Sequence, residues 1–325
     1  MTVLDRPRLG RWKGQRLPHL DRHIVIFVHG ILSDSSTFNK LLPLLETHDH
    51  ENALDLWVFD YNYRQPLTVS GDQLAEAINE RAFGDRRVDI VGHSMGGLVA
   101  RIAVIRNNLP NVSRIVTLAT PNHGTISGAQ LNMLGQMTAL GFRRLEPIYA
   151  RASGIFDLTD THSVMKEELK SMYRQDATRL NGKSYVSIPA QYYHKKRQLG
   201  DAPPSILIGR LSLGHQLFNR LTPIGAKLTA VHDGIVEERS NRLYPAPTGS
   251  SDEGSYMPSR AEANSRMLHA THDAGADCDH ITVTASPEVA DLIHAVLRAD
   301  TLDERGIDPL LRGPPGLVRL RPEVS

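Results

Sequence analysis

Residues 88–109 constrain the fold of this chain more than any other stretch. A short apolar run at residues 88–91 leads straight into Gly92-His93-Ser94-Met95-Gly96, which matches the pattern G-x-S-x-G. Apolar side chains then recur at helical spacing up to Pro110, at Leu98, Ile102, Ile105 and Leu109. A strand, a serine between glycines and a helix, in this order, are typical of a nucleophile elbow, a sharp turn that exposes its serine. The alternative is an ordinary glycine-rich turn, because so short a motif also recurs by chance.

Apolar runs and helical patterns alternate through the first 120 residues. Strands are predicted at residues 23–30, 54–61, 88–91 and 114–119. Between the first two lies a helical pattern that Pro43 is expected to break or kink. Ser70-Gly71-Asp72-Gln73 predicts a capping-box start for the next helix. The alternation predicts an α/β fold, with a mostly parallel, doubly wound sheet, helices on both faces and the chemistry at its carboxyl edge.

Regular patterning weakens after residue 124. Residues 125–156 mix glycine with methionine and leucine, and two interpretations are open. The segment is either a lid-like insertion over an apolar pocket, in which Met133, Leu134 and Met137 contact the substrate, or a helical layer that completes the core.

The elements beyond this segment are predicted from weaker signals. They are a helix at residues 157–180, a strand at 183–188, a helix at 206–221 with a strand at 206–208 as the alternative, a flexible excursion at 247–260 and a last strand at 267–271. Ser286 and Pro287 then begin a final helix, with the serine as its cap and the proline at its first position.

Composition excludes several classes of protein and of site. The 325 residues suit one large domain, predicted at residues 1–300, with a loosely packed tail at 301–325. Because 37 basic residues face 36 acidic ones, no single-sign field attracts nucleic acid as the main partner. Cys278 is the only cysteine, which excludes an internal disulfide and a cysteine-based zinc site. We expect no cofactor and no bound metal.

Residues 1–20 carry scattered basic side chains but no continuous apolar core. They predict neither a secretory signal nor a transmembrane segment, so we expect a cytoplasmic protein. The sequence leaves the oligomeric state open.

A serine nucleophile needs a histidine base and a carboxylate that orients the histidine. In a strand–elbow–helix architecture the expected chain order is nucleophile, acid, histidine. Of 15 histidines, His280 lies between the last predicted strand and the final helix, which predicts a place at the carboxyl edge; His272 and His269 are the alternatives. Asp233 is the candidate acid, and its alternative role is to cap the turn before Gly234.

Acyl transfer also builds negative charge on a carbonyl oxygen. Two backbone N–H groups can stabilise this charge by roughly 3 kcal/mol each. We predict that the Met95 amide and the Ile31 amide supply them, while His29 locks the loop that carries Ile31.

Several motifs coincide, in order, over residues 24–297. They are Val28-His29-Gly30-Ile31, Gly92-His93-Ser94-Met95-Gly96-Gly97, Ala119-Thr120-Pro121-Asn122-His123-Gly124-Thr125, Asp157-Leu158-Thr159, Asp233-Gly234-Ile235-Val236, and His280 before Ser286-Pro287-Glu288-Val289. Together they resemble α/β-hydrolases of the bacterial lipase and esterase type, related to the inositol-deacylase-like group. The resemblance implies Ser94 as nucleophile, Asp233 as acid, His280 as base, and the Ile31 and Met95 amides as the oxyanion hole.

The resemblance further implies a serine hydrolase that cleaves carboxylic esters of small acyl or lipid-like substrates through an acyl-enzyme. An acyltransferase or a thioesterase would use the same triad. A non-catalytic interaction protein of this fold is the alternative from a different class, against which the intact Ser94, Asp233 and His280 argue. Secreted lipases of this type carry a signal peptide, and many carry a disulfide or a calcium site; these features are not recognisable here, and the acyl chain and head group stay undetermined.

Overall fold

The computed structural model describes residues 6–12, 22–31, 33–81, 83–124, 157, 183–190, 233, 236, 238–241, 267–270, 278–299 and 317–319. The predicted lid at 125–156, with Met133, Leu134 and Met137, lies outside these residues, as do His272, the helix at 206–221 and the excursion at 247–260. Of the helix predicted at 157–180, only Asp157 is described.

The described strands form one eight-stranded sheet in the order β1-β3-β2-β4-β5-β6-β7-β8. Their bounds are β1 Arg8–Arg11, β2 His23–Val28, β3 Leu54–Asp60, β4 Val88–His93, β5 Val112–Leu118, β6 Ser184–Ile188, β7 Met267–Ala270 and β8 Leu317–Arg319. The strands from β3 to β7 in the sheet pair in parallel, whereas β1 and β8 pair antiparallel at the two edges. The predicted mostly parallel sheet is confirmed.

The two edge strands were not predicted. Both are short, and neither has the long apolar run of a strand buried on both faces. Because β8 lies within residues 301–325, the prediction that residues 267–271 form the last strand was wrong.

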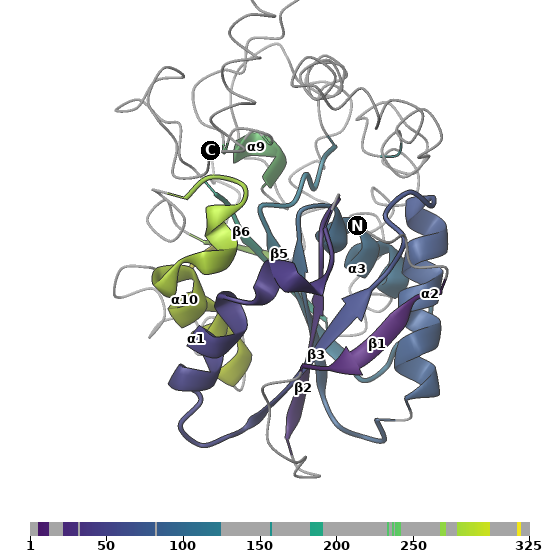
Figure 1. The fold of residues 1–325 in the computed structure, drawn as a ribbon, viewed down its shortest axis with the longest axis horizontal. Helices are drawn as coiled ribbons and strands as arrows, with labels where there is room; N and C mark the ends of the chain where they lie inside the picture. The colour runs from purple at the N-terminus through teal and green to yellow at the C-terminus, as the bar shows by residue number, and fades with distance from the viewer. Residues whose placement is uncertain are drawn as a thin grey trace, which may run out of the picture.

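Helices cover both faces of the sheet. α2 (Leu67–Glu80) and α3 (Met95–Arg106) pack on one face, and α1 (Leu41–His48) and α10 (Pro287–Arg298) pack on the other (Figure 1). Three short helices complete the described elements: η1 (Ser35–Phe38), α9 (Glu238–Asn241) and η5 (Thr282–Ala285). The doubly wound arrangement predicted from the alternating elements is therefore confirmed.

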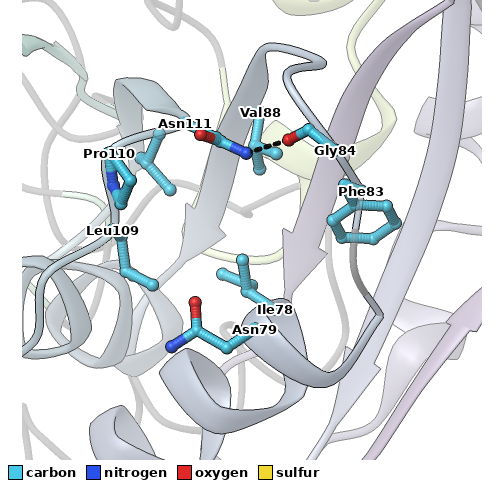
Figure 2. Close-up of a pocket in the computed structure, with 9 residues that line it drawn as sticks. Ile78, Asn79, Phe83, Gly84, Val88, Leu109, Pro110 and Asn111 are labelled. Carbon is cyan, nitrogen blue, oxygen red and sulfur yellow. Dashed lines mark hydrogen bonds between the residues drawn. The ribbon is translucent and has the colours of Figure 1, made fainter.

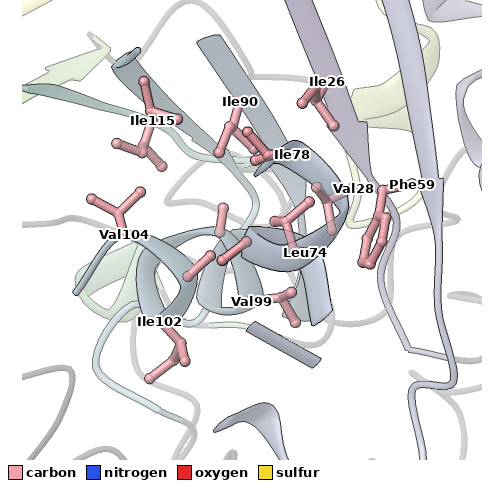
Figure 3. Close-up of a cluster of buried hydrophobic side chains, with 14 of the residues drawn as sticks. Ile26, Val28, Phe59, Leu74, Ile78, Ile90, Val99, Ile102, Val104 and Ile115 are labelled. Carbon is pink, nitrogen blue, oxygen red and sulfur yellow. The ribbon is translucent and has the colours of Figure 1, made fainter. Parts of the chain in front are cut away.

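Alternate residues of the central strands enter two separate cores. On one face Ile26, Ile90 and Ile115 pack with Leu74 of α2 and Ile102 of α3 (Figure 3). On the other face the intervening residues, including Val25, Phe27, Val91 and Val116, pack in the cluster that contains the apolar side chains of α1 and α10. Burial on both faces explains why these strands are continuous apolar runs.

Two local predictions in the first half were wrong. Pro43 does not break its helix, because it lies in the first turn of α1, where no intrahelical N–H donor is needed. The helix assigned to a capping box at Ser70 instead begins at Leu67, and the Leu67 N–H donates to the Asp157 carboxylate at 2.7 Å. That acceptor lies 90 positions further along the chain, so the local pattern could not show it.

A pocket of about 130 Å³ lies at the edge of the sheet where β4 and β5 begin (Figure 2). It is lined by Ile78, Asn79, Phe83, Gly84, Val88, Leu109, Pro110, Asn111 and Val112. The Asn111 side-chain amide donates to the Gly84 carbonyl across it. Since Ser94 follows the other end of β4, this pocket is separate from the candidate active site.

Candidate active site

Ser94 occupies the turn between β4 and α3 with φ 54° and ψ −128°. This conformation lies in a region that non-glycine residues rarely adopt, and it persists only when the surroundings hold it in place. The Ser94 N–H donates to the Leu118 carbonyl of β5 at 2.8 Å, and the Ser94 carbonyl accepts from Gly97 N–H at 3.1 Å. The sequence-predicted elbow is therefore present, with Ser94 at the carboxyl edge of the sheet.

Two glycines allow the elbow to pack against the loop after β2. A β-carbon at Gly96 would overlap the carbonyl oxygens of Val28 and His29. A β-carbon at Gly30 would lie 2.8 Å from the β-carbon of Ser94, closer than real contacts allow. Gly96 is needed because backbone approaches backbone there, and Gly30 is needed because the backbone approaches the Ser94 side chain.

The structure brings the three sequence-predicted triad residues together. Ser94 Oγ lies 2.8 Å from His280 Nε2, and His280 Nδ1 lies 2.7 Å from Asp233 Oδ2. In sequence, Asp233 follows β6 and His280 follows β7. All three residues are buried, Asp233 completely.

The Asp233 carboxylate is held on both oxygens. Its Oδ1 accepts from Val236 N–H at 2.6 Å. The Asp233 main-chain N–H donates to the Val236 carbonyl at 3.1 Å. The His280 N–H also donates to the Asp233 carbonyl at 3.0 Å. Because an ionised carboxylate only accepts hydrogen bonds, His280 carries its proton on Nδ1 and leaves Nε2 free to accept from the Ser94 hydroxyl.

His93 forms a hydrogen bond with the main chain of His280, and this role was not predicted from the sequence. Its Nε2–H donates to the His280 carbonyl at 2.8 Å, and the two ring centroids lie 5.1 Å apart. Burial, with a smaller contribution from the neighbouring His280, lowers the pKa of His93 to about 3. His93 is thus a neutral donor at physiological pH. Its place in the motif gave no signal for this role, because the acceptor is 187 positions away.

The predicted oxyanion donors lie on the two segments that meet at Ser94. Met95 is the first residue of α3, where helix N–H groups have no intrahelical acceptor. Ile31 follows Gly30 in the turn after β2. One amide thus follows the nucleophile and the other follows β2, and their role as the oxyanion hole stays a prediction.

His29 fastens the loop that carries Ile31. Tyr61 N–H donates to His29 Nε2 at 3.2 Å, so the proton is on Nδ1, which donates to the Gly30 carbonyl at 2.8 Å. The Tyr61 hydroxyl donates to the His29 carbonyl at 3.0 Å. Burial lowers the pKa of His29, which keeps the ring neutral in this role.

In the described part of the chain, no three histidine, cysteine, aspartate or glutamate side chains gather in a way that could hold a metal ion. None of the helices in the same residues combines the length and the apolar composition that a membrane crossing needs.

Part of the sequence and the overall fold are similar to known proteins. Residues 20–141 match the PGAP1-like alpha/beta domain. The mature form of Bacillus licheniformis lipase BlEst2 aligns with a TM-score of 0.56 at 19% identity, covering 90% of this chain and 97% of that one. This chain has the α/β-hydrolase fold.

Two other structures agree with this α/β-hydrolase fold. The propeptide form of the same lipase gives a TM-score of 0.53 at 19% identity, covering 91% of this chain and 54% of that one. The product of gene lin2722 from Listeria innocua gives 0.50 at 14% identity, covering 87% and 97%. A search of curated protein sequences found no significant match. The α/β-hydrolase fold predicted from the motifs is confirmed.

Proposed function

We propose that this protein is a serine hydrolase that cleaves carboxylic esters of acyl or lipid-like substrates through an acyl-enzyme. One observation carries the proposal: the chain of contacts from Ser94 Oγ to His280 Nε2 at 2.8 Å and from His280 Nδ1 to Asp233 at 2.7 Å. The lipase-like fold supports an ester as the substrate.

Acylation follows from the positions of these atoms. His280 Nε2 takes the hydroxyl proton while Ser94 Oγ bonds to the ester carbonyl carbon, and Asp233 stabilises the imidazolium that forms. The carbonyl oxygen gains negative charge, which the Ile31 and Met95 amides stabilise. His280 then gives its proton to the departing alcohol oxygen, and the acyl group stays on Ser94.

Deacylation reverses the roles with water as the nucleophile. His280 accepts a proton from water, the hydroxide oxygen bonds to the acyl carbon, and the proton passes to Ser94 Oγ as the carboxylic acid leaves. An alcohol or a thiol could replace water in this step, so the acceptor is determined by product analysis.

A fluorophosphonate probe tests the nucleophile directly. Wild-type protein should take up one label on Ser94, and Ser94→Ala should take up none and lose about 10⁶-fold in kcat. Ser70→Ala is the matched control, since Ser70 is also a buried serine but lies on α2. If the folded wild type takes no label, or if Ser94→Ala is labelled equally, the proposal is wrong.

A panel of p-nitrophenyl esters from acetate to palmitate then tests the substrate class. We expect release of nitrophenol with a chain-length preference in kcat/KM. Adding alcohol and thiol acceptors separates hydrolysis from transfer, and exclusive transfer to the alcohol would replace the hydrolase assignment by an acyltransferase.

A further inference from the structure

The turn after β5 contains a buried asparagine, Asn122, whose side chain contacts that strand. Ala119, at φ 47°, reverses the chain immediately after Leu118. Asn122 then points its side chain back toward β5, where its Nδ2–H donates to Thr117 Oγ1 at 3.2 Å. Asn122 is only 1% exposed. The turn therefore presents a polar side chain to the interior of the protein.

Asn122 is hydrogen-bonded to α9, the helix that begins two residues after Val236. Its main-chain N–H donates to the Ser240 carbonyl at 2.7 Å, and its Nδ2–H donates to the Asn241 carbonyl at 2.7 Å. The Ser240 hydroxyl donates in turn to the Gly124 carbonyl. Because Val236 holds both the main chain and the carboxylate of Asp233, α9 anchors one end of the segment that carries the acid.

Arg101 of α3 fixes the orientation of Asn122. Its Nη1 donates to the Asn122 carbonyl at 2.8 Å and to Asn122 Oδ1 at 3.2 Å. With Oδ1 facing the guanidinium, the Nδ2–H group faces Thr117 and Asn241. Arg101 is completely buried, and it lies on the helix that starts directly after Ser94. α3 thus connects Ser94, at its start, to Asn122, which Arg101 contacts.

We propose that Asn122, oriented by Arg101, is a positioning residue for the acid of the triad. It acts by holding α9, and through α9 the Asp233–Val236 turn, at the distance that aligns His280 with Ser94. This inference rests on the proposed function, because it concerns the same triad. The hydrogen bonds of Asn122 go to Arg101, Thr117, Thr120, Ser240 and Asn241, and none of them involves a reacting atom.

Asn122→Ala removes both bonds that Nδ2 donates. We expect kcat to fall about 10- to 100-fold with KM nearly unchanged, because small misplacements of catalytic groups act on the chemical step. Asn122→Asp keeps the side-chain shape and the contact with Arg101, but it places an oxygen against the Asn241 carbonyl, so it should show the same loss. This second variant covers the case in which Asn122→Ala does not fold.

A double-mutant cycle separates positioning from a general loss of structure. If Asn122 acts through Asp233, the substitution should cost less than about threefold in an Asp233→Asn background, since coupled residues are not additive. Asn107→Ala is the matched control. The partly buried Asn107 side-chain amide donates to the Asp72 carboxylate and to the Ala103 carbonyl, away from α9. The substitution should lower the unfolding temperature and leave kcat unchanged.

Proton NMR gives a readout that does not depend on turnover. The Nδ1 proton between His280 and Asp233 should resonate at low field in the wild type and in Asn107→Ala, and should be lost or shifted in both Asn122 variants. An unchanged resonance with unchanged kcat, or an equal cost in the Asp233→Asn background, would show that Asn122 only stabilises the fold. A wild type that a fluorophosphonate does not label would contradict the proposed function, while the resonance would still decide the role of Asn122.

Discussion

At the scale of single residues, the site depends on groups that can hydrogen-bond in one way only. The Asp233 carboxylate accepts from His280 Nδ1–H, which leaves Nε2 to accept from Ser94. The neutral rings of His93 and His29 likewise each donate a hydrogen bond to a main-chain carbonyl beside the site. Burial lowers the pKa of both histidines and keeps them neutral, so these two hydrogen bonds do not require a charged ring.

Gly30 gives a prediction at this scale. In Gly30→Ala the new methyl group meets Ser94 at 2.8 Å, so the loop that carries the Ile31 amide must shift. Losing one oxyanion donor costs about 10²- to 10³-fold in kcat, and we expect a loss of about 100-fold measured with p-nitrophenyl acetate.

The control for this variant is Gly10→Ala on β1, where the nearest atom to a new β-carbon lies at an ordinary 3.6 Å. It should retain full activity. Wild-type kcat in a folded Gly30→Ala variant would refute the assignment of this loop to the oxyanion hole.

At the scale of elements, the His280 segment is built by short-range caps. The Asp279 carboxylate accepts from the N–H groups of Ile281 and Thr282 at 2.9 and 2.8 Å, which forms the turn directly after His280. The Ser286 hydroxyl then accepts from Val289 N–H at 3.2 Å, and Pro287 begins α10. The final helix was predicted from this serine and proline, and that prediction is confirmed.

Ser286→Ala should therefore lower the free energy of unfolding by about 1 kcal/mol, the usual cost of a lost helix cap. Urea unfolding measures this loss, and the kcat of the folded fraction should stay unchanged because Ser286 does not contact the triad. Ser286→Thr keeps a hydroxyl acceptor and should recover most of the stability. An equal loss in the alanine and threonine variants would mean that the hydroxyl does not cap α10.

At the scale of the whole molecule, one sheet gathers residues from the full length of the chain. Gly30 follows β2 and Ser94 follows β4, while in sequence Asp233 follows β6 and His280 follows β7. Parallel strands bring their carboxyl ends to one edge, which is why residues 186 positions apart meet there. The same packing buries the polar rings of His29 and His93, and their burial makes the stability of the protein depend on pH.

Stability should fall as the pH drops below about 6.5. The pKa of His93 is lowered to about 3, and that of His29 is also lowered, from an ordinary value of 6.5. Between the folded and unfolded pKa values the unfolded chain binds more protons, so the stabilisation is present above pH 6.5 and is lost with acidification. Each histidine contributes a slope of up to about 1.4 kcal/mol per pH unit.

Urea unfolding at pH 7, 6 and 5 measures this slope. His93→Gln removes one of the histidines whose pKa is lowered by folding, and the variant should unfold with a shallower pH dependence than the wild type. The same slope in both proteins would show that His93 does not remain neutral in the folded state.

The amino-acid sequence by itself determined the central strands, the elbow at Ser94 and the chain order of the candidate triad. Each of these signals is local, because a strand, a helix cap or a tight turn is specified by neighbouring residues. The same reasoning predicted the final helix from Ser286 and Pro287 and the doubly wound sheet from the alternation of elements.

Only the tertiary structure decided which distant groups become partners. The start of α2 depends on Asp157, the support of His280 depends on His93, and the anchoring of α9 depends on Asn122 and Arg101. The edge strands β1 and β8 likewise exist because β3 and β7 offer them a partner. A buried donor needs an acceptor that packing brings to it, and no local pattern records which residue that acceptor will be.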